Sequence, residues 1–216
     1  MTTTTATRST SASTLHALLD LARGEDLDAG NSGPARRVQL CIVGALASLG
    51  LAAVFGIAVG STDVMLAAGN VLKVPMVLLL SVLSSLPAAL VAQKLLTLPG
   101  TGRSVVESVA AGKFASGLVL FVLAPVVAIY YHTSAWAGPM LGIASVVAAL
   151  AVGHLVFLRA LMNRRPQGSS RRSAAVPAVV FIVLQSLTLV QFISLASPMF
   201  PESTKFNGGI DTLIQR

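Results

Sequence analysis

Histidines, a single cysteine and a few serines are the side chains of this chain best suited to chemistry. The histidines are His16, His132 and His154, and they stand far apart along the chain, without the short spacing that is typical of metal ligands. Cys41 is the only cysteine, so neither an intramolecular disulfide nor a cysteine metal cluster can form. The sequence therefore predicts no metal site and no cofactor.

Catalysis inside a membrane would require a serine close to a histidine, or paired aspartates, within apolar segments. The one such combination is Ser84 or Ser85 with His154, and no GxSxG or HExxH motif accompanies it. Gly112 and Lys113 lack the rest of a phosphate-binding loop. We therefore expect no catalytic residues and a protein that is not an enzyme.

Four polar residues lie within or beside long apolar runs and could line a solute pathway across a membrane. They are Lys73, His154, Gln185 and Gln191. Structural roles are favoured: interhelical hydrogen bonds for the glutamines, and contact with lipid headgroups or with Asp63 for Lys73. His154 stands five residues before Arg159, about 7.5 Å along a helix, which favours a place near the membrane surface.

The composition indicates the kind of scaffold that must position these residues. The chain has 216 residues, of which 54% are hydrophobic and 11% charged, and its mean hydropathy is +0.80. Soluble domains carry about 25% charged residues. Few aromatic residues and long apolar runs favour packed helices over a β-barrel with alternating strands. We therefore predict an all-α, polytopic membrane protein.

Five apolar runs are long enough to cross a bilayer, which takes about 20 helical residues. The predicted transmembrane helices cover residues 38–60, 74–96, 105–131, 138–161 and 174–198, within a transmembrane domain of residues 38–201. The first run is too long for a signal-peptide core of about 7–15 residues. It is therefore predicted to be the first span.

Polar tails flank the predicted spans. Residues 1–37 form an N-terminal tail in which Leu15, Leu18, Leu19 and Ala22 recur at helical spacing, which predicts a short amphipathic helix. This helix is expected on the bilayer surface, with docking onto a soluble partner as the alternative. Residues 202–216 form a short C-terminal tail.

The distribution of basic residues predicts the orientation of the chain. With the N-terminus in the cytoplasm, twelve of the 15 Lys and Arg residues fall on the inner side. This predicts an N-in/C-out topology. The arginines of residues 159–172 then contact anionic lipids and account for much of the net charge of +7. No aromatic residues alternate with them, so no nucleic-acid site is expected.

Small residues recur every three to four positions in the first and fourth spans, a pattern typical of close helix packing in membranes. They are Gly44, Ser48, Ala52, Gly56 and Gly60, and then Gly138, Gly142, Ser145, Ala149 and Gly153. Contacts within the chain are favoured, and an interface between identical chains is the alternative.

The second span combines a polar stripe with a proline. Its small residues are expected to face protein, and the leucines at 79, 83, 86 and 90 to face lipid. The small residues are Ser81, Ser84, Ser85, Ala88 and Ala92. Pro87 is expected to kink this span and Pro125 the third, with serine hydroxyls or a neighbouring helix bonding the freed carbonyl group.

Prolines and a capping pattern also predict where helices begin. Pro75, Pro139 and Pro177 fall near the expected starts of spans two, four and five, where a missing N–H costs little. Ser104 and Glu107 match a capping box, which places the start of the third helix there.

Three short motifs carry a resemblance to a known family. Lys73-x-Pro75, Leu86-Pro87 and Ala124-Pro125 resemble the pattern of an uncharacterised family of bacterial multi-pass inner-membrane proteins. The match covers roughly residues 38–205, although the end of span two departs from it. The resemblance implies a bacterial plasma membrane location and no established activity. Five spans with N-in/C-out topology also resemble the Yip1-like membrane proteins, which are implicated in membrane organisation and trafficking.

These features predict a scaffold or accessory subunit of a membrane complex. The alternative is a small channel or transporter with a polar path through the second and fifth spans. The expected partners are the bilayer, anionic lipids at the arginine loops, and a second copy or another membrane protein.

Overall fold

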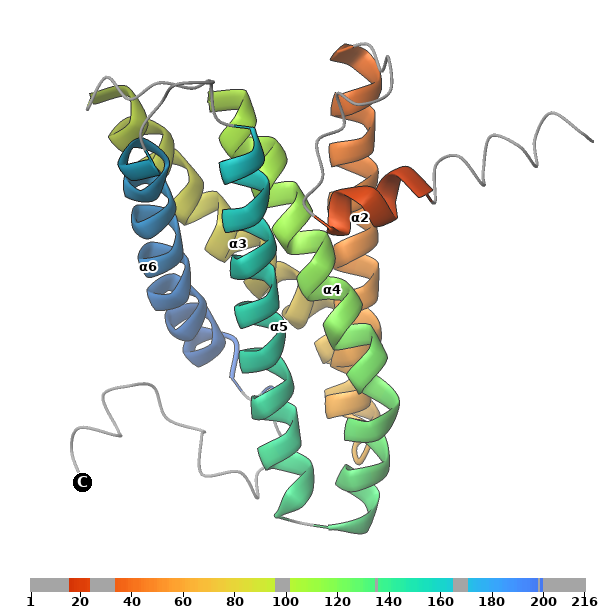
Figure 1. The fold of residues 1–216 in the computed structure, drawn as a ribbon. Helices are drawn as coiled ribbons and strands as arrows, with labels where there is room; N and C mark the ends of the chain where they lie inside the picture. Colours follow the sequence, from red (N-terminus) through yellow and green to blue (C-terminus); the bar gives the residue numbers. More distant parts are fainter. Residues whose placement is uncertain are drawn as a thin grey trace, which may run out of the picture.

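Five long helices run alternately up and down in a computed structural model of the chain (Figure 1). They are α2 (Pro34–Val59), α3 (Val64–Leu95), α4 (Gly102–Thr133), α5 (Ala137–Asn163) and α6 (Arg171–Leu195). A shorter helix covers residues 16–22. The structure describes residues 16–23, 34–95, 102–134, 136–164, 171–197 and 199, and no β-strand occurs among them. The predicted all-α class is confirmed.

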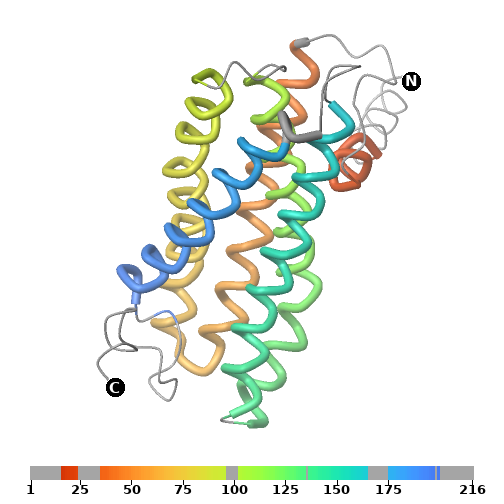
Figure 2. The backbone as a smooth tube through the Cα atoms, turned by 60° about the vertical axis from the view of Figure 1, so that its left-hand side comes forward, coloured from red at the N-terminus to blue at the C-terminus, as the bar shows by residue number. Residues whose placement is uncertain are grey.

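Each of the five long helices is long and apolar enough to cross a membrane. The protein is therefore a multi-pass membrane protein with five candidate spans, as predicted. Because the number of spans is odd, α2 begins at one end of the bundle and α6 finishes at the other (Figure 2). Which end faces the cytoplasm stays a prediction.

The helices pack unevenly. α4 packs along α5 and α2, whereas α3 packs along α6 and α2 and scarcely touches α4. α2 and α3 meet at the turn that joins them and diverge toward their other ends, with α3 leaning onto α6 (Figures 1 and 2). This divergence separates α2 from α3 at the end of the bundle where α4 begins (Figures 1 and 2).

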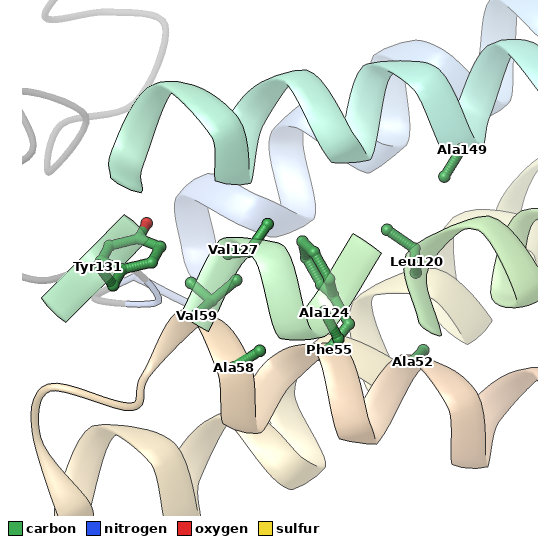
Figure 3. Close-up of a cluster of buried hydrophobic side chains, with 9 residues drawn as sticks. All are labelled: Ala52, Phe55, Ala58, Val59, Leu120, Ala124, Val127, Tyr131 and Ala149. Atoms are coloured by element: carbon green, nitrogen blue, oxygen red, sulfur yellow. The ribbon is translucent and has the colours of Figure 1, made fainter. Parts of the chain in front are cut away.

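Alanines and a few large side chains interlock in the core between α2, α4 and α5 (Figure 3). Phe55 and Val59 of α2 pack there against Leu120 and Val127 of α4, with Ala149 of α5 completing the cluster. In a bilayer such close packing, rather than water exclusion, holds helices together. A second cluster joins α5 to α6 and α3 around two phenylalanine rings, whose centroids lie 4.9 Å apart in a tilted arrangement.

The second long helix begins ten residues before the predicted span. α3 starts at Val64, because the carboxylate of Asp63 accepts hydrogen bonds from the backbone N–H groups of Met65 (2.7 Å) and Leu66 (3.2 Å). Pro75 therefore lies inside the helix, and its predicted place at the helix start is wrong. Pro177 likewise lies inside α6. At the start of α3 the cap at Asp63 determines where the helix begins, and Pro75 does not.

The predicted capping box is also wrong. α4 already begins at Gly102, so Ser104 is an interior residue of the helix. Glu107 accepts a hydrogen bond from Nε of Arg103 at 2.7 Å instead of reaching back to the helix start. The strong charge-assisted bond to arginine takes the carboxylate away from the backbone.

The short N-terminal helix packs on the bundle itself. Leu18 and Leu21 are buried against Phe114 of α4 and Ala160 of α5. Leu21 also lies close to Gly44 of α2, because a Cβ placed there would stand 3.1 Å from the leucine. The apolar face that was expected to contact lipid or a soluble partner is thus covered by α2, α4 and α5.

Candidate functional site

Buried serines of α3 lie four residues apart, on one face of the helix. Ser81 and Ser85 are fully buried, and their hydroxyls donate to the carbonyls of Leu78 and Ser81 at 2.8 and 2.7 Å. Ser84 is exposed, with its hydroxyl bonded to Leu80, so its predicted place on the protein-facing side is wrong. Ser84 directly precedes Ser85, and neighbouring residues of a helix do not share a face. Ser84 therefore lies beside the face that contacts protein and not on it.

Two prolines lie inside long helices on exposed positions. Pro87 belongs to α3 and Pro125 to α4, and both helices continue on either side of them. None of the serine hydroxyls of α3 bonds to the carbonyl of Leu83, which Pro87 leaves without its usual N–H. Of the two partners expected for this carbonyl, the serine hydroxyls are therefore excluded, and a neighbouring helix stays a prediction.

Of the four residues proposed for a pathway, the structure brings two together. Nε2 of His154 lies 3.3 Å from Oε1 of Gln185, which joins α5 to α6. Gln185 is fully buried, and its Nε2 has no hydrogen-bond partner among the described residues. Gln191 is exposed on α6. Lys73 is half-buried and lies in the first half of α3.

The five packing residues predicted for the first span are all buried, namely Gly44, Ser48, Ala52, Gly56 and Gly60. Gly56 faces the backbone carbonyl of Asn70 so closely that a Cβ would overlap it. A Cβ on Gly60 would stand 2.5 Å from the backbone nitrogen of Ala67 in α3. Ser48 lies against Gly117 of α4. Residues of this stripe thus contact α3 and α4 of the same chain.

The five packing residues predicted for the fourth span are buried as well, namely Gly138, Gly142, Ser145, Ala149 and Gly153. A Cβ on Gly138 would stand 2.7 Å from Cα of Tyr131, and Gly153 faces Gly112 and Ser116 of α4. The hydroxyl of Ser116 donates to the carbonyl of Ala149 at 2.9 Å, across the two helices. Because α4 carries a glycine and a serine opposite the stripe, the two backbones approach closely at this crossing.

A buried charge cluster lies where α4 begins and α5 ends. Glu107 accepts from Arg103 at 2.7 Å, and its second carboxylate oxygen lies 3.6 Å from Nε of Arg164. The guanidinium group of Arg164 is almost completely buried. The sequence signals only part of this cluster, namely the i,i+4 pair of Arg103 and Glu107 on one helix face. The contribution of Arg164 depends on the packing of α5 against α4.

A cavity of about 280 Å³ lies between α2, α3 and α4, where α2 and α3 diverge. Aliphatic side chains form most of its walls, and Lys113 of α4 is its charged lining residue. We refer to this cavity as the α2–α3–α4 cleft. The sequence does not reveal the cleft, because it arises from the divergence of two helices.

Neither of the chemical sites considered from the sequence is assembled among the described residues. They contain no group of three or more His, Cys, Asp or Glu residues that could hold a metal ion. The hydroxyls of Ser84 and Ser85 bond to backbone carbonyls of their own helix, whereas His154 contacts Gln185. The three side chains do not form a serine–histidine pair.

The chain was compared with known proteins at three levels: family models, curated sequences and solved structures. No family model, no curated protein and no solved structure matches it.

Proposed function

We propose that this protein is a non-enzymatic, multi-pass protein of a bacterial plasma membrane, with its N-terminus in the cytoplasm, that serves as a scaffold or accessory subunit of a membrane complex. The small-residue stripes of α2 and α5 contact neighbouring helices of the same chain. A partner in the membrane therefore has to be sought on the outward faces of the bundle.

The exposed amide of Gln191 is the observation that carries this proposal. Gln191 stands one turn before the end of α6, inside the stretch long and apolar enough to cross a membrane. The exposed residues Leu187 and Leu195 flank it, and its side-chain amide makes no hydrogen bond with the described residues. An amide facing hydrocarbon is costly unless it is bonded, and polar side chains of this kind join helices in membranes. A polar group on a neighbouring subunit would satisfy it.

Site-specific photo-crosslinking in native membranes tests this assignment. A crosslinking residue in place of Gln191 is expected to give an adduct with a second polypeptide, because the partner helix would lie against that position. The same residue in place of Leu155, which is exposed on α5, is the matched control and is expected to give lipid adducts only. Lipid adducts at both positions would contradict the proposal.

A small channel or transporter is the second candidate, favoured by the contact of His154 with Gln185 between α5 and α6. On the accessory-subunit proposal, vesicles that contain the purified protein should conduct K⁺ and protons no faster than protein-free vesicles. Flux that is lost in Gln185→Leu and kept in Gln191→Leu would instead support a pathway, because only Gln185 lies inside the bundle. Fluorescent ion indicators inside the vesicles provide the measurement.

A further inference from the structure

The α2–α3–α4 cleft opens sideways, toward the surroundings of the bundle. Its rim carries the exposed side chains Ile42, Leu79 and Val106. A shallower hollow shares Ile42 and Val106 with the cleft and extends it to Arg103 and Glu107 at the start of α4. Together they form a groove that is charged at one end and apolar along the rest of its length.

Lys113 brings a positive charge into the apolar part of this groove. Its side chain lines the cleft, and it makes no ion pair or hydrogen bond with any residue that the structure describes. The nearest carboxylate on the same helix is Glu107, six residues or about 9 Å away. That carboxylate already forms ion pairs with Arg103 and Arg164. The positive charge of Lys113 is therefore not paired with Glu107.

The position of Lys113 along α4 matches the edge of the hydrocarbon layer. The helix continues for 20 residues after it, from Phe114 to Thr133. At 1.5 Å per residue these span about 30 Å, the thickness of a bilayer core. Tyr130 and Trp136 are exposed at the far end, where aromatic side chains typically mark the other interface. The ammonium group of Lys113 thus lies at the depth where lipid headgroups meet acyl chains.

We propose that the α2–α3–α4 cleft binds one anionic phospholipid, with its phosphate at Lys113 and an acyl chain in the cleft. The volume of about 280 Å³ holds roughly nine groups of water or methylene size, at about 30 Å³ each. The positive charge of Lys113 beside an apolar slot suits an anionic headgroup with its chain. The inference does not depend on the proposed accessory function.

Native mass spectrometry of the full chain tests this site. The protein is purified from nanodiscs that contain equal amounts of phosphatidylglycerol and phosphatidylcholine, and the lipids that remain bound are counted. The wild type is expected to keep one phosphatidylglycerol. Lys113→Gln should lower the preference for phosphatidylglycerol by about fivefold, the effect of one basic residue near a membrane surface. Lys94→Gln, which removes the charge of an exposed lysine at the end of α3, is the matched control and should change nothing.

Two further variants keep the proposal falsifiable if Lys113→Gln folds poorly. Lys113→Arg retains the positive charge and should retain the lipid. Ala45→Phe fills the cleft without changing any charge, and it should reduce the retention of both lipids. Equal retention of the two lipids by the wild type, or equal losses in the Lys113→Gln and Lys94→Gln variants, would overturn the assignment.

Discussion

Replacing Gly153 by leucine is expected to destabilise the bundle more than any other single change in α5. A Cβ at this position would overlap the hydroxyl oxygen of Ser116 and stand 2.8 Å from the carbonyl oxygen of Gly112. The larger side chain has to separate α4 from α5, which also breaks the hydrogen bond from Ser116 to Ala149. Overpacking a core lowers the free energy of unfolding by about 1–3 kcal/mol. Because the backbone atoms at this site cannot rotate away, we expect a loss of about 3 kcal/mol or more.

Thermal unfolding in mild detergent, followed by circular dichroism, measures this effect. The matched control is Gly50→Leu, because nothing lies within 4 Å of a Cβ placed on Gly50. Both variants add the same side chain to an apolar helix, so a difference in Tm reports packing alone. Similar melting temperatures for the two variants would show that the crossing of α4 and α5 is not as close as described.

Removing the charge of Glu107 is expected to have the second large effect. Only 10% of its side chain and 4% of that of Arg164 are exposed. In Glu107→Gln the volume stays nearly constant, but Arg164 loses the negative charge of this carboxylate. Breaking a buried ion pair from one side costs about 3–5 kcal/mol. Arg103 is 44% exposed, so its guanidinium group can be solvated when the carboxylate is removed. We therefore expect a loss of stability at the lower end of this range, about 3 kcal/mol.

Unfolding by graded addition of sodium dodecyl sulfate to detergent micelles provides the measurement. Asp20→Asn is the matched control, because it removes the carboxylate of an exposed ion pair with Arg23 at 3.6 Å. An exposed pair contributes roughly 0.2–1 kcal/mol, so this variant should unfold close to the wild type. If the two variants lose similar stability, the cluster around Glu107 is a surface pair and not a buried one.

Several features of this protein follow from local sequence. Five apolar runs of about 20 residues predict five membrane-length helices, because a bilayer has no water to satisfy an open backbone. The four-residue spacing of Gly56 and Gly60, like that of Ala149 and Gly153, also places each pair on one face of its helix. Both rules depend only on residues close together in the chain.

The detailed helix ends and the orientation of α3 did not follow from these rules. Asp63 caps α3, which begins ten residues before the predicted span, since side-chain hydrogen bonds at a helix start can extend a helix beyond the membrane core. Ser84 was expected on the protein side and is exposed. A helix that is apolar all round gives no amphipathic signal, so its sequence does not show which face meets protein.

The tertiary structure alone decided which distant residues meet. His154 contacts Gln185 across α5 and α6, and Arg164 reaches Glu107 across α5 and α4. The cleft beside Lys113 exists because α3 leans onto α6 and away from α2. The sequence by itself determined the number, length and small-residue stripes of the helices, since these depend on the bilayer and on helical spacing. The tilt of each helix depends on contacts between segments far apart in the chain, and that tilt forms the charge cluster and the cleft.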